Sequence, residues 1–519
     1  MTQPLADDTV PEEIKTVQRL RGLRDHVRTH MGGPQAVDAI HAAGRRTARE
    51  HIAGLVDPDS FCEIGTFATF TDKVTAPEAG NYGGGIIGGQ ARLDGRPVTV
   101  AADDDSVAWP SARSTGKAAR LYQMARQRRH PYIEIAQGDA VPDLGPRPGK
   151  TGTEAGRTFG AEPAFPYLLE RGRAIPVVSA VLGDASGASS LSAGLCDFLV
   201  QLDGTRLSLA GPEPDGAAGD AAASGEVDAV VTEPDEAYAA IRRFLSYLPS
   251  HSGGPLPVAA EDVPLGYDDG IATLVPARRS RAYDMKAVIR RLCDPGSFFE
   301  LKAAYARNIV TGFGRLAGIP VGVVANAPMR MAGGLTPECC LKAVSFVCLC
   351  EGFGVPLIVL QDTPGFLVSA AAERDRAVVR VMALLQALSL VTVPTVSVVV
   401  RKAFGLAFVI LDANRRAGLS LAWPGAEIGF MDPPVAANVL FEPVIRELPE
   451  TERAEFLAAK AAELGVVFEP YGVAANLTVD EVIEPGATRK VVGDYLRGWL
   501  ESGPSPHVAG PLASWPRWF

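Results

Sequence analysis

The stretch from Val393 to Leu411 reads VPTVSVVVRKAFGLAFVIL and carries a pattern that the chain uses twice. Its first part, Thr395 to Val400, is rich in β-branched residues and predicts a buried strand. The apolar segment from Leu406 to Leu411 predicts a helix, and Gly405 ends the tight turn between them. Glycine lets the backbone approach a ligand closely, and the first N–H groups of a helix have no partner inside it. Such a turn is either an anion-binding cradle or an ordinary strand–turn–helix connection.

The same pattern occurs in the first half of the chain. Residues 175–189, IPVVSAVLGDASGAS, align without a gap with residues 393–407, VPTVSVVVRKAFGLA. Four further matches follow the same order: DPDSFCEIG from Asp57 with DPGSFFELK from Asp294, GRPV from Gly95 with GIPV from Gly318, HPYIEI from His130 with VPLIVL from Val355, and LSLAGP from Leu207 with LSLAWP from Leu419. Ordered matches of this kind are hard to obtain by chance, so the sequence predicts a duplicated domain.

Each half therefore predicts a strand, a turn, a helix and a strand in succession. This succession needs crossover connections, so we expect an α/β fold with largely parallel sheets and helices outside them. The predicted division is an N-terminal helical segment (residues 1–45), a first domain (residues 46–255) and a second domain (residues 268–519), with a linker beginning near Ser252. The low-complexity segment from Glu213 to Glu226 predicts a mobile surface loop, either a filler or a functional lid.

The composition indicates an α/β enzyme core. The chain has 519 residues, which is too long for one ordinary core and favours two large domains. The formal net charge of −10 argues against a nucleic-acid partner, because such a partner demands a basic face. The first residues carry no secretory signal, and polar residues with Pro394 interrupt the most apolar region, residues 378–400. We therefore expect a cytoplasmic protein with no membrane partner.

The cysteines and histidines limit the possible chemistry. None of the seven cysteines forms a CxxC pair, which indicates buried reduced thiols and no metal site. All seven histidines lie outside residues 252–506. A reaction at the Gly405 turn would therefore have to proceed without a local histidine base.

The duplication turns one candidate cradle into two. Gly187 and Ala188 occupy in the first half the positions that Gly405 and Leu406 occupy in the second. Backbone N–H groups at a helix start can stabilise a developing oxyanion. Two such turns predict a reaction in which two oxyanions develop.

Two pairs of side chains flank the second turn. Phe404 and Phe408 would either wall a pocket or pack in the core. Arg401 and Lys402 would either meet a phosphate or carboxylate or be solvated. In the first half a solvated helix face is predicted; its basic residues are Arg113, Lys117 and Arg120.

Another glycine turn, QDTPGF at residues 361–366, follows the predicted strand at residues 355–360. It lies at the carboxyl end of that strand, where ligands bind in parallel sheets. Asp362 in this turn is either a catalytic acid or a residue that shapes the loop.

With these passages the chain resembles the carboxyltransferase (β) subunits of biotin-dependent acyl-CoA carboxylases, of the propionyl-CoA carboxylase type. The resemblance covers essentially residues 46–496. The passages that carry it are DPDSF from Asp57, VANAPM from Val324, DTPGFL from Asp362, RKAFG from Arg401, AWPGAEI from Ala422 and IEPGATR from Ile483.

The resemblance implies two tandem crotonase-like (ClpP/crotonase) domains, each a β-β-α superhelix, in a hexamer built as a trimer of dimers. It implies transfer of CO2 from carboxybiotin to the α-carbon of an acyl-CoA, at a site between the N domain of one protomer and the C domain of the next. The biotin would be carried by a separate biotin carboxylase/biotin carboxyl carrier subunit, and no metal is implied here. The first turn would hold the thioester oxygen and the second the ureido oxygen of biotin, and released biotin would itself take the α-proton.

The resemblance also implies a substrate or biotin pocket around the second turn. Its candidate residues are Pro364, Gly365, Phe366, Phe404, Phe408 and Val409. Among them, Val409 would help to shape the acyl pocket.

The chain departs from the family pattern at both turns. The family has paired glycines there, whereas Ala188 and Leu406 follow the first glycine in this sequence, and QGDAV from Gln137 replaces the family's DSGGAR. A backbone N–H survives both substitutions, but Leu406 adds bulk where biotin would lie. Two alternatives therefore stay open: a biotin-independent decarboxylase or acyl/carboxyl transferase on a malonyl-type thioester, and a weakly catalytic structural paralogue in a mixed carboxylase hexamer.

Overall fold

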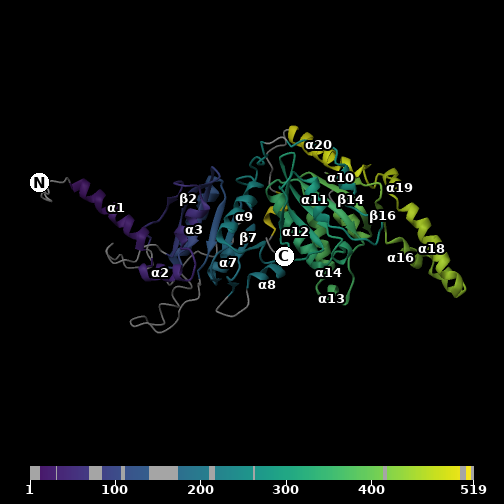
Figure 1. Ribbon diagram of the computed structural model, residues 1–519, viewed down its shortest axis with the longest axis horizontal. Coiled ribbons are helices and arrows are strands. Elements are labelled where there is room, and N and C mark those ends of the chain that lie inside the picture. Colours follow the sequence, from purple (N-terminus) through teal and green to yellow (C-terminus); the bar gives the residue numbers. More distant parts are fainter. Residues whose placement is uncertain are drawn as a thin grey trace. The chain divides into compact units, whose positions relative to one another are not determined.

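The computed structural model divides the chain into two compact units, each built around one large sheet (Figure 1). The described residues are 12–30, 32–68, 85–106, 112–138, 173–209, 217–260, 263–412, 418–502 and 510–515. The first unit comprises Met1–Arg171, Ile175–Ala221 and Val230–Arg242, and the second comprises Gly172–Ala174, Ala222–Ala229 and Arg243–Phe519. The division falls inside helix α9 (Pro234–Ser246). The domain boundaries expected from the sequence stay a prediction.

The sheet of the first unit is parallel except at one edge. Its strands, in spatial order, are β1 (Cys62–Glu63), β2 (Ile86–Leu93), β3 (Arg96–Asp103), β4 (Tyr132–Ala136), β5 (Val177–Val181), β7 (Phe198–Leu202) and β9 (Ala229–Val231). β2 is antiparallel to both β1 and β3, whereas the pairs β3–β4, β4–β5 and β5–β7 are parallel. A small parallel sheet joins β6 (Ala185–Ser186) to β8 (Leu207–Ser208). The other helices of this unit are α1 (Glu12–His30), α2 (Pro34–Ala42), α3 (Ala48–Leu55), α4 (Ala112–Arg128), α7 (Ala188–Gly194) and α8 (Ala218–Ser224).

The sheet of the second unit has the same construction. Its strands, in spatial order, are β10 (Phe299–Leu301), β11 (Ile309–Leu316), β12 (Ile319–Asn326), β13 (Leu357–Thr363), β14 (Thr395–Phe404), β15 (Gly418–Ala422) and β17 (Glu481–Val482), and β16 (Glu427–Gly429) pairs with the end of β14. The helices include α10 (Asp269–Ala272), α11 (Met285–Leu292), α12 (Pro337–Gly352), α13 (Ala370–Arg374), α14 (Ala377–Leu390), α15 (Leu406–Leu411), α16 (Pro433–Leu440), α17 (Glu442–Glu447), α18 (Glu450–Val467), α19 (Pro470–Ala475) and α20 (Thr488–Glu501). The predicted α/β architecture with largely parallel sheets is confirmed.

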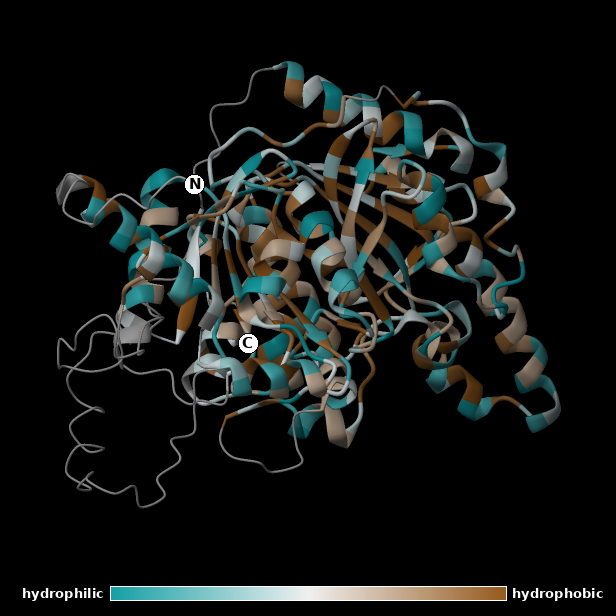
Figure 2. Cartoon of the chain, turned by 60° about the vertical axis from the view of Figure 1, so that its left-hand side comes forward, coloured by the Kyte–Doolittle hydropathy of each residue, from teal (hydrophilic) through white to brown (hydrophobic). Residues whose placement is uncertain are grey.

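The cores lie along the sheets. Every residue of β4, β5, β12 and β13 is buried, which explains why these strands are mostly apolar and do not alternate between apolar and polar residues. Figure 2 shows the hydrophobic residues concentrated on the strands and the hydrophilic ones on the outer helices. Burial on both faces fixes each strand within its sheet.

Several helices begin where the sequence supplies a side-chain cap, as α3 and α12 show. Thr47 and Glu50 form a capping box at α3, in which the Thr47 N–H donates to Glu50 Oε2 at 2.7 Å. Thr336 caps α12, whose first residue is Pro337. Proline suits this position because the N–H that it lacks would have no partner inside the helix.

Strand register supports the duplication and corrects one of its matches. Val178 pairs with Phe198 across β5 and β7, as Val396 pairs with Leu419 across β14 and β15. Phe198 is therefore the counterpart of Leu419. The match of Leu207 with Leu419 is wrong, because Leu207 pairs in the small sheet beyond β5. The shared letters LSLA had hidden this difference in register.

The loop that begins each half repeats its hydrogen bonds as well as its sequence. The Asp57 carboxylate accepts the N–H groups of Asp94 and Gly95 at 2.9 and 2.7 Å. The Asp294 carboxylate accepts those of Ala317 and Gly318 at 3.0 and 2.8 Å. In each case an aspartate clamps the turn of the following β-hairpin.

The second of these clamps is the more buried. Asp294 also pairs with Arg489 at 2.6 Å, and both side chains are less than a tenth exposed. Asp57 lies 3.6 Å from Arg242, and both of those side chains are 27% exposed.

One expectation about a surface segment is wrong. The segment from Glu213 to Glu226 was expected to be a mobile loop, but it contains α8, in which Ala218 and Ala221 are buried. Alanine is the strongest helix former, so a segment of low complexity can still fold when one face packs. Residues 210–216 lie outside the described residues.

The expected solvated face of basic residues is also wrong at one position. Lys117 donates to the carbonyl oxygens of Ile86 and Gly65 at 2.6 and 3.1 Å. Burial lowers the pKa of Lys117 to about 8. Arg120 is exposed as expected, and the side chain of Arg113 lies outside the described residues.

All seven thiols are free, and all but that of Cys62 are buried. In the part of the chain that the structure describes, no cluster of three or more metal-ligating side chains is found. No described helix is both long and apolar enough to cross a membrane.

Replacing Asp294 by alanine tests whether the repeated clamp stabilises the second unit. The change leaves Arg489 buried without its carboxylate, so we expect the free energy of unfolding to fall by about 3–5 kcal/mol. Asp57→Ala is the matched control in the first unit, with an expected loss of about 1–2 kcal/mol because its carboxylate is more exposed. Urea denaturation measures both losses, and equal losses would contradict this account.

Candidate active site

The second glycine turn requires glycine for two reasons. Gly405 has φ 64° and ψ −149°, a conformation that strains any other residue. A Cβ at this position would also lie 3.2 Å from the carbonyl oxygen of Phe430. The strand before it is longer than predicted and ends at Phe404, because residues 402–404 pair with β16. The predicted helix from Leu406 to Leu411 is confirmed as α15.

The glycine N–H is not the free donor of this turn. It already donates to the carbonyl oxygen of Gly429 at 2.9 Å. The donors that a ligand can use are therefore the N–H groups at the start of α15, on Leu406 and Ala407. This arrangement ties the glycine to the neighbouring strand and leaves the N–H groups of the next two residues available to a ligand.

The first turn has the same geometry. Gly187 has φ 57° and ψ −122°, and its N–H donates to the carbonyl oxygen of Leu209 at 3.2 Å. Helix α7 begins directly afterwards, so the corresponding donors are the N–H groups of Ala188 and Ser189. The structure thus builds both predicted turns, each within its own unit.

The side chains around the second turn fall into two groups. Leu406 and Val409 are 68% and 54% exposed. Phe404 is buried against Ala436 and Phe468, and Phe408 packs in a different buried cluster. This favours the packing alternative for both phenylalanines, and their role in a pocket stays a prediction. Leucine at position 406 does not fill the interior, and its side chain lies in the open.

The loop from Pro364 to Phe366 lies beside the second turn. Gly365 has φ 119°, and a Cβ there would lie 3.6 Å from the carbonyl oxygen of Phe404. The loop is held by Leu335, whose N–H donates to the Gly365 carbonyl at 3.0 Å. Two glycines therefore leave the backbone uncovered on adjacent strand ends.

A buried ion pair supports this region. Arg401 Nε and Nη2 each lie 3.1 Å from Asp362 Oδ2, and its guanidinium stacks over the Tyr283 ring at 4.8 Å from the centroid. Burial raises the pKa of Asp362, and the positive charge of Arg401 opposes that rise. Arg401 is therefore not solvated, and its contact with a ligand stays a prediction. For Asp362 the structural alternative is favoured.

The first unit holds a different polar cluster at the corresponding place. Gln137, the counterpart of Asp362, donates through Nε2 to the Asp103 carbonyl at 3.0 Å and to Asp105 Oδ1 at 3.3 Å. Arg45 forms an ion pair with Asp105. A Cβ on Gly183, the counterpart of Arg401, would lie 2.9 Å from Arg45 Nη2. A guanidinium thus occupies similar positions in both halves. It comes from Arg401 of β14 in the second half and from Arg45, in the loop before α3, in the first.

Sequence reasoning missed two residues of this cluster. Asp103 ends β3, and its carboxylate accepts a hydrogen bond of 2.5 Å from the hydroxyl of Ser189 in α7. The alignment of the two halves could have pointed to both residues. The first half has an acid and a hydroxyl where the second half has Asn326 at the end of β12 and Ala407 in α15.

Comparison with known proteins gives these two units a family. A family model described as the carboxyl transferase domain matches residues 39–498. The chain belongs to the carboxyl transferase family. Its fold is accordingly the predicted pair of crotonase-like domains.

Characterised relatives cover nearly all of this carboxyltransferase. It is 34% identical to the propionyl-CoA carboxylase beta chain of Saccharopolyspora erythraea, over 94% of each chain. It is 31% identical to the methylmalonyl-CoA carboxyltransferase 12S subunit of Propionibacterium freudenreichii subsp. shermanii, over 90% of each chain. A crystal structure of a transcarboxylase 12S hexamer with methylmalonyl-CoA bound superposes with a TM-score of 0.86 at 28% identity, covering 96% of this chain and 97% of that one.

These relatives confirm the predicted enzyme class. The protein is a carboxyltransferase of the biotin-dependent acyl-CoA carboxylase type. Neither the biotin-independent alternative nor the weakly catalytic paralogue finds support among them.

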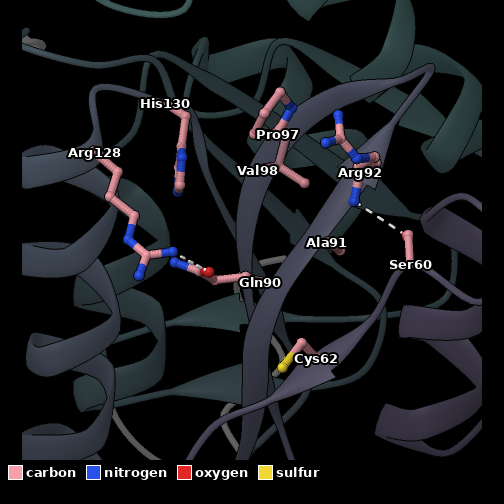
Figure 3. A pocket seen from close by; sticks show the side chains of 9 residues that line it. All are labelled: Ser60, Cys62, Gln90, Ala91, Arg92, Pro97, Val98, Arg128 and His130. Atoms are coloured by element: carbon pink, nitrogen blue, oxygen red, sulfur yellow. Dashed lines mark hydrogen bonds between the residues drawn. The ribbon is translucent and has the colours of Figure 1, made fainter.

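A separate pocket of about 380 Å³ lies in the first unit of this carboxyltransferase (Figure 3). The residues that line it are Ser60, Cys62, Gln90, Ala91, Arg92, Pro97, Val98, Arg128 and His130. None of them belongs to either glycine turn. Within it, Arg128 donates to Gln90 and the Arg92 N–H donates to Ser60. The pocket therefore stands apart from the candidate active site.

Removing both members of the buried ion pair separates a structural role from a catalytic one. Arg401→Met alone should lower the free energy of unfolding by about 3–5 kcal/mol, because it leaves the Asp362 carboxylate buried without a partner. The double variant Asp362→Leu/Arg401→Met should recover most of that loss, since well-packed apolar residues replace buried pairs at little cost. Urea unfolding and the carboxyltransferase assay measure the two effects. A stable but inactive double variant would make Asp362 a catalytic acid.

Proposed function

We propose that this carboxyltransferase moves CO2 from carboxybiotin, held on a separate carrier subunit, to the α-carbon of an acyl-CoA. The first turn, at Gly187 and Ala188, holds the thioester oxygen, and the second, at Gly405 and Leu406, holds the ureido oxygen of biotin. One observation carries this proposal: both turns tie the glycine N–H to the carbonyl of a neighbouring strand or loop and present the next N–H groups at a helix start. A reaction with two developing oxyanions needs two such sites.

The residues at the second turn fit a biotin ring. Gly405 and Gly365 leave the backbone uncovered on adjacent strand ends, and the exposed Leu406 side chain does not pack across them. When bound there, carboxybiotin would supply the activated CO2. Val409, half exposed on the same helix, would contact the acyl group or the ring.

The chain contributes chiefly position and electrostatics. Each backbone donor aimed at a developing oxyanion contributes about 3–4 kcal/mol of transition-state stabilisation. Asp362 is engaged with Arg401, and residues 252–506 contain no histidine. General-base catalysis by a histidine beside the second turn is therefore not part of the proposal.

We further propose that the protein acts in the cytoplasm as a hexamer, a trimer of dimers, and works with a biotin carboxylase/biotin carboxyl carrier subunit. The second unit supports assembly, because α16, α17 and α18 carry large exposed apolar side chains. These are Val435, Val439, Leu440, Val444, Val466 and Val467. The two turns can then meet across protomers, as the family resemblance implies.

The direct test of this function is a reconstituted assay. Purified protein is incubated with a biotinylated carrier, its biotin carboxylase, ATP, labelled bicarbonate and a series of acyl-CoA thioesters. We expect label in at least one carboxylated acyl-CoA. No label in any thioester would refute the proposal, and CO2 release from malonyl-CoA or methylmalonyl-CoA without a carrier would favour the biotin-independent alternative.

Two variants at one position test the second turn. Leu406→Pro removes the backbone donor but preserves the fold, because proline is tolerated at the first position of a helix. We expect kcat to fall about 10²- to 10³-fold. Leu406→Ala is the matched control, which trims the side chain and keeps the N–H. If the two variants have equal activity and equal melting temperatures, this N–H plays no part in the reaction.

A further inference from the structure

The hydrogen bond between Asp103 and Ser189 joins the end of a strand to the first turn of α7. Ser189 follows Ala188, and it is buried. The same oxygen, Asp103 Oδ2, also lies 3.4 Å from the backbone nitrogen of Gln137, which donates to it. One carboxyl oxygen thus connects the ends of β3 and β4 to the helix that presents the first turn.

The second half makes the corresponding connection with a neutral side chain. Asn326, the counterpart of Asp103, accepts the N–H of Asp362 at 3.2 Å through its amide oxygen. Its Nδ2 donates to the carbonyl of Gly333 at 3.1 Å. No hydroxyl reaches it from α15, where Ala407 takes the place of Ser189. The connection between the strand ends therefore forms with a neutral side chain. The first half has an acid and a hydroxyl at the corresponding two positions.

The surroundings of Asp103 oppose its negative charge. Burial and the nearby negative charge of Glu134 raise the pKa of Asp103, the hydrogen bond from Ser189 lowers it, and the net pKa is about 7. Other charged or titratable groups on the neighbouring elements and loops include Asp104 and Asp105 beyond β3, Arg45 before α3, His51 in α3, and Lys117 in α4. Arg45 is paired with Asp105, and burial holds His51 neutral by lowering its pKa to about 4. The described part of α7 brings no charge.

We propose that Asp103 is a positioning residue of the first turn: through Ser189 it holds the first turn of α7, and the turn binds an oxyanion best when the Asp103 carboxyl is neutral. The proposal rests on the function proposed above, in which that turn binds the thioester oxygen. A carboxylate beside this site would repel the negative charge that develops there, whereas a neutral acid keeps the same hydrogen bonds. Deprotonation of Asp103 should therefore weaken the binding of the developing oxyanion at the first turn.

Asp103→Asn tests the proposal, since it keeps the shape and fixes the neutral state. The ratio of its kcat/KM for the acyl-CoA to that of the wild type should rise on the order of tenfold between about pH 6 and about pH 8.5. The ratio cancels other titrations that both proteins share. A role in folding alone predicts a constant ratio, and a constant ratio would overturn the proposal.

Ser189→Ala provides a second, directional variant. Its hydroxyl lowers the pKa of Asp103, so its removal should keep the acid neutral to higher pH. The kcat/KM of Ser189→Ala, taken as a ratio to that of Asp103→Asn, should fall at a higher pH than the same ratio does for the wild type. A shift to lower pH would contradict the proposed link between these two residues.

Infrared difference spectroscopy of wild type against Asp103→Asn tests the protonation state without any enzymatic assay. The C=O stretch of a neutral carboxylic acid should be present at about pH 6 and absent at about pH 8.5. Its absence at the lower pH in an active enzyme would overturn this proposal alone. Its presence in a protein that carboxylates no acyl-CoA would refute only the proposed function.

Discussion

The site depends on one backbone constraint, a glycine at positive φ whose N–H is bound to a neighbouring strand or loop. At Gly405 this bond goes to the carbonyl of Gly429, and at Gly187 it goes to that of Leu209. Because the glycine is held in this way, a buried strand can pass into a helix within one residue. The first N–H groups of the helix then stand at the end of the sheet without a partner in their own helix. The buried ion pair and the aspartate clamps hold this turn between strand and helix in place.

The two halves share this frame and differ in the polar groups that support it. Under the second turn a charged pair, Asp362 with Arg401, is fully enclosed. Under the first, Gln137 takes the place of the acid, and the guanidinium comes from Arg45, for which Gly183 leaves room. A duplicated domain can change such groups separately in each half, because the backbone bonds that set the turn do not involve them. This freedom suits turns that bind chemically different oxygens.

Much of the frame could be predicted from the sequence, since gapless repetition of a strand, a glycine and a helix reports backbone geometry directly. The register beyond the turn could not, because the letters shared by Leu207 and Leu419 are common in any buried strand. The pairing of Arg401 with Asp362 was also out of reach. The fold decides which residues far apart in sequence form an ion pair. From the sequence alone, an arginine beside a glycine turn suggests a bound ligand as readily as a buried ion pair. The Asp103–Ser189 bond was missed for the same reason.

In the proposed reaction the two turns bind two different oxygens. A structure of the protein with an acyl-CoA and a biotin bound is the decisive test. The thioester oxygen should lie at the N–H groups of Ala188 and Ser189, and the ureido oxygen at those of Leu406 and Ala407. A thioester oxygen at the second turn, or at neither turn, would contradict this assignment.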